Sequence, residues 1–167
     1  MNPHSFRHAL IALLAASAAL LPACVPAGSQ RVGDLRIEEP WARATPPGAS
    51  VSGGFLVIRN LGDREDRLLS VTSSAAARVE LHTMRNEDGV MKMRPLRSGI
   101  AIPAGAEATL RPGGDHLMWI EPRQPFAGGD VVVAHLHFER TGDVEVAFRV
   151  RGAGAGADKR AGSAHHH

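Results

Sequence analysis

Four of the five methionines in this 167-residue chain lie close together and share their segment with two histidines. The first methionine begins the chain, and the other four fall between positions 84 and 118. With the histidines they form three patterns: His82-x-Met84, Met91-x-Met93 and His116-x-Met118. On a β-strand, residues i and i+2 point to the same face, so each pattern presents its two side chains together.

Thioether and imidazole groups in one segment indicate a copper site. Methionine sulfur is soft and neutral, and it favours Cu(I) over Zn²⁺, Mg²⁺ or Ca²⁺, whereas imidazole suits copper in general. A single methionine is usually core filler, but three matched pairs favour a metal site. A blue-copper electron-transfer centre needs a cysteine thiolate. The only cysteine is Cys24, near the N-terminus, so we do not expect such a centre.

The elements that position these residues are predicted to be β-strands. After position 27, short apolar runs alternate with Gly, Pro, Asp and Asn. Strands are predicted at 55–58, 68–71, 79–84, 90–94, 116–121, 130–139 and 144–150. A helical turn is expected only at 75–77. Short strands with regularly spaced turns predict a single all-β domain, an antiparallel sandwich or barrel.

The alternate residues on these strands are suited to the core. Leu81 precedes His82, and Leu117 and Trp119 flank Met118. The His and Met side chains are therefore expected on a face that is not the main core. The Pro-Gly-Gly turn at 112–114 is expected to place the first residue of the next strand near the surface.

Further stretches extend the pattern around His82. They read Gly89-Val90-Met91-Lys92-Met93-Arg94-Pro95, Ile102-Pro103-Ala104-Gly105, Pro112-Gly113-Gly114-Asp115-His116-Leu117-Met118 and, upstream, Trp41-Ala42-Arg43-Ala44-Thr45-Pro46-Pro47-Gly48. With them the chain resembles the periplasmic copper chaperone family PCu(A)C over residues 35–150. The family pattern is a His, then a Met after ten residues, then His-x-Met about twenty residues later. Here ten residues separate His82 from Met93, and twenty-two separate Met93 from His116.

The resemblance implies a cupredoxin-like Greek-key β-sandwich that binds one Cu(I) through His82, Met93, His116 and Met118. It also implies delivery of copper to the copper-site subunit of cytochrome c oxidase or to another copper-assembly protein. We therefore expect an extracytoplasmic metallochaperone that acts as a monomer by ligand exchange. We do not expect an enzyme, because no nucleophilic Cys or Gly-x-Ser-x-Gly motif lies in the domain. Two alternatives stay open: a copper buffering or resistance protein without a dedicated client, and a metal-free structural lipoprotein.

Four other His and Met residues need a separate interpretation. Met84 shares a face with His82, and Met91 shares a face with Met93, so we expect them to pack beside the site or to assist copper transfer. His135 and His137 lie on one face of the predicted 130–139 strand. We interpret them as solvent-facing residues, with a weak accessory metal site as the alternative.

The two ends of the chain are set apart from the predicted domain at 28–151. Residues 1–27 are typical of a signal peptide, with a weakly basic start and an apolar run too short to span a bilayer. Leu21-Pro22-Ala23-Cys24 resembles a lipobox, in which Cys24 would carry a lipid and anchor the protein to the membrane. Cleavage at Ala27 would instead release a soluble protein. Either route predicts the periplasm.

The C-terminal segment, residues 152–167, is Gly/Ala-rich and is predicted to be a flexible tail. It ends in His165–His167, which either form a native Cu(II)-binding tail or remain from a purification tag. The overall composition argues against a nucleic-acid partner. The 19 Lys and Arg are interspersed with 17 Asp and Glu, the formal net charge is +2, and Tyr is absent.

Overall fold

A computed structural model describes residues 28–152 and 154 of the chain. The regular secondary structure of these described residues consists of β-strands alone, and they contain no helix long and apolar enough to cross a membrane. The strands are β1 (Gln30–Val32), β2 (Leu35–Arg43), β3 (Val51–Asn60), β4 (Asp66–Thr72), β5 (Ala76–Glu87), β6 (Val90–Pro95), β7 (Ile100–Ile102), β8 (Glu107–Leu110), β9 (His116–Pro122), β10 (Val131–Phe138) and β11 (Gly142–Arg151). The signal-peptide, lipobox and His-tail predictions lie outside the described residues.

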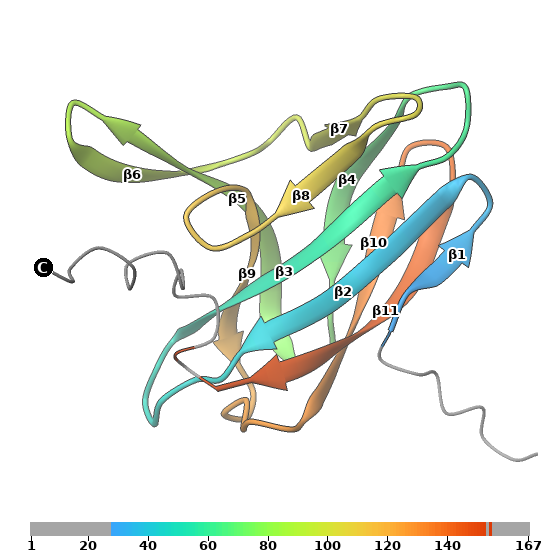
Figure 1. The fold of residues 1–167 in the computed structure, drawn as a ribbon. Helices are drawn as coiled ribbons and strands as arrows, with labels where there is room; N and C mark the ends of the chain where they lie inside the picture. The colour runs from blue at the N-terminus through green and yellow to red at the C-terminus, as the bar shows by residue number, and fades with distance from the viewer. Residues whose placement is uncertain (1–27, 153, 155–167) are drawn as a thin grey trace, which may run out of the picture.

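The strands form one continuous hydrogen-bonded path in the order β6-β5-β9-β3-β2-β11-β10-β4-β7, with β1 added to β2 and β8 added to β3. The pairs are antiparallel except β2 with β11, which run parallel. Figure 1 shows that the path folds over, so that β4 and β10 lie behind β2 and β3. The predicted all-β, single-domain fold is confirmed.

The core lies between the two layers, and β10 shows most clearly how alternating side chains build it. On β10, Val132, Ala134, Leu136 and Phe138 are buried, and every residue between them is exposed. His135 and His137 are among those exposed residues, facing Glu145 and Asp143 of β11, as expected for solvent-facing histidines.

Trp119 anchors β9 in this core. It is fully buried and meets the rings of Phe126 and Phe148 edge-on, with centroid distances of 5.9 and 5.2 Å. Edge-to-face pairs of this kind stabilise a fold by about 0.5–1.5 kcal/mol each beyond the area they bury. Because Trp119 follows Met118 directly, the same anchor fixes the strand that carries His116 and Met118.

The helical turn predicted at 75–77 is wrong. Ser74 and Ala75 form a turn, and β5 begins at Ala76. The carbonyl of Ala75 accepts a hydrogen bond from the amide of Arg123, and Ala76 pairs with Pro122 of β9. A single helical turn is costly to nucleate, so these long-range sheet contacts determine the local structure.

The β5–β6 hairpin extends away from the two-layered body (Figure 1). Its turn consists of Asp88 and Gly89, both with positive φ, at 55° and 83°, as the two central residues of a type I′ turn require. All six residues of β6 are exposed. The arm is therefore held by its backbone ladder and by surface ion pairs from Glu87 to Lys92 and Arg94, with no apolar core of its own.

Candidate metal centre

The predicted His and Met residues meet on one face of three adjacent strands, β6, β5 and β9. In the sheet register, His82 lies directly opposite His116, and Met84 lies directly opposite Met93. Residues directly opposite each other in a sheet point to the same face. Met118 lies two residues along β9 from His116 and joins that face. The shared face predicted from the i, i+2 spacing is confirmed.

Four of these side chains line one cavity of about 360 Å³: Met84, Met93, His116 and Met118. The other lining residues are Arg43, Val51, Ser52, Gly53, Phe55, Pro112 and Gly113. The cavity therefore contains three of the four predicted ligands, together with Met84, whose role the sequence left open.

His82, the fourth predicted ligand, is buried next to the cavity but does not line it. Its ring centroid lies 5.9 Å from that of His116, and the rings are inclined by 36°. Metal–imidazole bonds are about 2.0–2.1 Å long for zinc, so two rings on one ion have centroids roughly 5–6 Å apart. The observed spacing is compatible with one metal ion held by both rings.

His116 begins β9, as the turn before it predicts, but the expectation that it lies near the surface is wrong. It is only 6% exposed and faces into the cavity. Its Nδ1 donates a hydrogen bond of 2.9 Å to the carbonyl of Gly114. The same carbonyl accepts a hydrogen bond of 3.1 Å from the amide of Met84. The turn before β9 is therefore hydrogen-bonded both to β5 and to the His116 imidazole.

The protonation state of His116 suits a metal ligand. Burial lowers the pKa of its imidazole, and the nearby His82 and Arg43 lower it further, against the opposing effects of the Gly114 hydrogen bond and Asp115. The ring is therefore held neutral near pH 7. With Nδ1 bonded to the backbone, the lone pair of Nε2 is left for another partner.

The two methionines of β6 differ in position, although both are about half exposed, Met91 at 48% and Met93 at 47%. Met93 lines the cavity, whereas Met91 lies opposite Asn86 and is not part of the wall. Met93 thus reaches both the cavity and the solvent, at the side where the hairpin forms the wall.

The charge of the cavity wall is positive. Arg43, from the end of β2, is the charged residue in the lining, and its guanidinium lies 5.7 Å from the centroid of the Phe55 ring. Across the described ranges, no three His, Cys, Asp or Glu residues gather in a metal-binding arrangement. Three thioethers and an imidazole beside a guanidinium suit a soft, singly charged ion such as Cu(I) better than a hard divalent cation.

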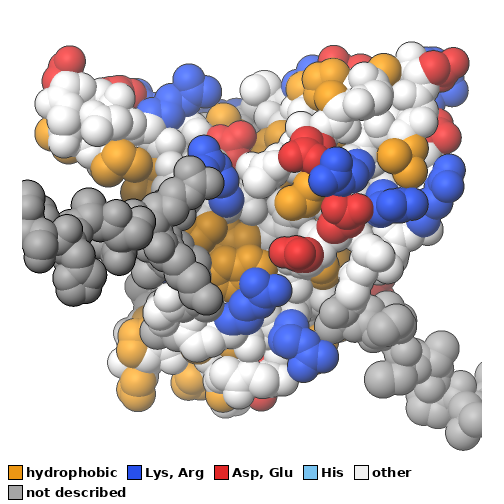
Figure 2. Space-filling view, viewed as in Figure 1, with side chains coloured by type: hydrophobic (Ala, Val, Ile, Leu, Met, Phe, Trp, Pro, Cys, Tyr) orange, Lys and Arg blue, Asp and Glu red, His pale blue; other side chains and the backbone are white. Residues whose placement is uncertain are grey.

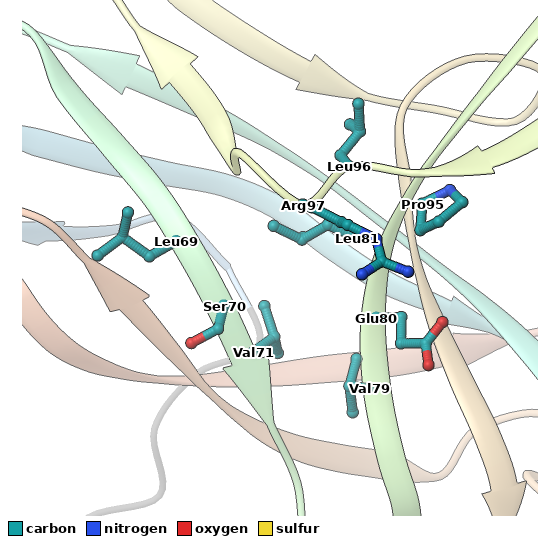
Figure 3. A pocket seen from close by; sticks show the side chains of 9 residues that line it. All are labelled: Leu69, Ser70, Val71, Val79, Glu80, Leu81, Pro95, Leu96 and Arg97. Atoms are coloured by element: carbon teal, nitrogen blue, oxygen red, sulfur yellow. The ribbon is translucent and has the colours of Figure 1, made fainter.

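A second cavity, of about 340 Å³, lies between β4 and β5 and contains no His or Met (Figure 3). Leu69 and Val71 form one side and Val79 and Leu81 the other. Glu80 belongs to this lining too, but Figure 3 shows its carboxyl group pointing away from β4. On the face shown in Figure 2, acidic and basic side chains are intermixed and do not form patches of one sign.

Comparisons with known proteins cover nearly all of the described chain. The family model described as "Putative lipoprotein LpqE-like" matches residues 35–150. The protein "Putative lipoprotein Lxx21020" of Leifsonia xyli subsp. xyli is 28% identical over 143 residues, which is 86% of this chain and 85% of the relative.

Solved structures with a similar fold include a copper-bound PCuAC domain from PmoF2. It is 27% identical, with a TM-score of 0.63, and the match covers 74% of this chain and 97% of that domain. The solution structure of apo-DR1885 from Deinococcus radiodurans is 24% identical, with a TM-score of 0.57, and the match covers 88% of this chain and 97% of that one. The latter likeness concerns the fold alone.

Proposed function

The chain belongs to the LpqE-like family and has the cupredoxin-like fold of PCuAC domains, and on this premise we propose that it is an extracytoplasmic copper-binding metallochaperone. The predicted resemblance to the PCu(A)C family is confirmed. One observation carries the proposal: the thioethers of Met84, Met93 and Met118 and the imidazole of His116 line a single cavity. Soft, neutral ligands of this kind suit Cu(I).

The proposed Cu(I) ligands are His82, Met93, His116 and Met118. Met93, His116 and Met118 share the cavity, and the ring centroid of His82 lies 5.9 Å from that of His116. All four ligands are neutral, so a departing copper ion leaves no uncompensated negative charge on any of them. Because Met93 is half exposed, a partner's ligand reaches copper from that side, as exchange through a shared-ligand intermediate requires.

The proposed client is the copper-site subunit of cytochrome c oxidase or another copper-assembly protein. The family description and the relative's name, both of which include "lipoprotein", support a position outside the cytoplasm, with Cys24 as the proposed lipid anchor. Mixing copper-loaded protein with the apo copper domain of the oxidase tests the client. Copper that stays on this protein would favour a buffering role. Mass spectrometry of the mature N-terminus tests the anchor.

Copper binding is tested by anaerobic titration against a Cu(I) chelator of known affinity. The variant Met93→Leu/Met118→Leu removes two thioethers, and each Met-to-Leu exchange changes stability by less than about 1.5 kcal/mol because it conserves volume. We expect its Cu(I) affinity to fall by at least about a hundredfold, or about 2.7 kcal/mol.

The matched control is Met91→Leu, which changes a methionine of the same strand and the same exposure outside the cavity. Its affinity should equal that of the wild type. X-ray absorption on the loaded wild type should show both sulfur and nitrogen ligands. Equal affinity in the double variant and the wild type would refute the site.

A further inference from the structure

Three side chains form a hydrogen-bonded row along one face of β5, and the row ends at His82, next to the cavity that His116 lines. Arg78, Glu80 and His82 are spaced i, i+2, so they point to the same side of the strand. Arg78 Nε donates to Glu80 Oε1 at 2.9 Å, and Glu80 Oε2 lies 2.8 Å from His82 Nε2. Both carboxylate oxygens are engaged, which fixes the orientation of the carboxylate against the imidazole.

The hydrogen bond at Nε2 of His82 defines the tautomer of its neutral ring. An ionised carboxylate only accepts hydrogen bonds, so Nε2 of His82 must carry the hydrogen that it donates to Glu80. In the neutral ring, Nδ1 is then the bare nitrogen. Nδ1 of His82 is buried and has no hydrogen-bond partner. An unpaired, buried acceptor is unfavourable, and a metal ion would satisfy it.

His116 has the opposite arrangement. Its Nδ1 donates to the carbonyl of Gly114, which leaves Nε2 bare. A histidine that binds a metal usually donates its other N–H to a carboxylate or a backbone carbonyl, and this bond sets the tautomer and the ring orientation. The two rings, 5.9 Å apart, each have one such partner, but on opposite nitrogens.

From this geometry we infer that Glu80 is a positioning residue that makes His82 bind copper through Nδ1, while His116 binds through Nε2. The inference rests on the proposed function, because copper is the ion that the two rings would share. Arg78 orients Glu80, and Glu80 orients His82. The copper site thus extends beyond its ligand His82 by two positions along β5, to Glu80.

The first test observes the imidazole directly. Long-range ¹H–¹⁵N correlations in ¹⁵N-histidine-labelled protein distinguish the two tautomers of each ring. In the wild-type apoprotein, His82 should be the Nε2–H tautomer and His116 the Nδ1–H tautomer. In Glu80→Ala, His82 should populate both forms and His116 should stay unchanged. A His82 tautomer unaffected by Glu80→Ala would overturn the inference.

The second test adds Cu(I), which is diamagnetic and allows the same spectra. Copper should shift Nδ1 of His82 and Nε2 of His116, and Glu80→Ala should weaken Cu(I) binding by about 10–100-fold. Glu80→Gln, which keeps a carbonyl acceptor, should lose less Cu(I) affinity than Glu80→Ala. The control is Glu107→Ala, which removes a carboxylate paired with Arg59 on β3 and should bind copper normally.

The outcomes separate the inference from the proposed function. Wild-type protein that binds Cu(I) through Nε2 of His82, or Glu80→Ala protein with unchanged affinity, would overturn the role of Glu80 and leave the copper site in place. Wild-type protein that binds no Cu(I) would instead refute the proposed function, and the role of Glu80 toward copper with it.

Discussion

Gly54 is the position where the smallest change should perturb the site most. It lies in the middle of β3, paired with Ala42 of β2 and Leu117 of β9. A Cβ added at Gly54 would lie 2.0 Å from Cζ3 and 2.5 Å from Cη2 of Trp119. Both distances are far shorter than the roughly 3.5–4.0 Å at which carbon atoms pack favourably.

Trp119 has little freedom to relieve this contact. The ring is fully buried and is held edge-on by Phe126 and Phe148, so the backbone of β3 or β9 must shift. Forcing an extra carbon into a well-packed core typically costs about 1–3 kcal/mol, occasionally more. We expect Gly54→Ala to lose about 3 kcal/mol, at the upper end, because the new atom would overlap the ring itself.

Urea unfolding followed by tryptophan fluorescence and circular dichroism measures this loss. With a slope of about 1–3 kcal/mol per molar urea, the midpoint should fall by roughly 1–3 M. Cu(I) affinity should fall too, although every proposed ligand is retained, because β9 carries His116 and Met118. The control is Gly128→Ala, at a glycine without positive φ whose Cβ would meet nothing within 4 Å. There the change should be neutral or stabilising by about 0.4–1 kcal/mol. A Gly54→Ala midpoint equal to that of the control would refute the packing argument.

Two further predictions concern acid stability and oxidation. Burial raises the pKa of the Asp66 carboxyl, but hydrogen bonds from Thr141, Arg140 and Arg67 outweigh it and hold the pKa below its usual value. The folded state therefore keeps the charged form, and its contribution is complete above about pH 4 and is lost as the pH falls through the folded pKa. Asp66→Asn should lower the unfolding free energy at pH 7 by about 2–3 kcal/mol and flatten the pH dependence of urea midpoints below pH 4. An unchanged acid profile would contradict this. Dilute peroxide should oxidise the exposed Met91 and Met93 first, abolishing tight Cu(I) binding in a way that methionine sulfoxide reductases reverse. Bound copper should protect Met93 and not Met91 in peptide mass spectrometry, and equal protection of both would contradict the assignment.

Periodicity made the strands with one buried face predictable from the sequence. β10 alternates without interruption, and the predicted 130–139 run differs from the observed strand by one residue at each end. β2 was not predicted because its pattern breaks: Pro40 lies inside it, and the register shifts between Glu38 and Trp41, where Glu39 has a φ of 49°. β1, β7 and β8, of three or four residues each, are too short to show a period.

The part of the candidate site that depends on residue spacing was predictable from the sequence. The i, i+2 patterns assigned the shared face, but not the depth, so the burial of His82 and His116 could not be inferred. Arg43 enters the cavity from β2 through tertiary packing alone. Glu80 did leave a signal, because Glu80-x-His82 has the same spacing as the His-Met pairs. A carboxylate two residues before a histidine on a strand is a pattern to look for in similar sequences.

The solvent-exposed β6 has a consequence for how long copper stays bound. Segments that lack core contacts open locally at a small fraction of the free energy of global unfolding. The wall that carries Met93 should therefore open and close many times during the lifetime of the folded domain. The residence time of copper on the protein should therefore depend on how readily the β5–β6 hairpin opens. A stable sandwich fold and rapid release of copper are then compatible.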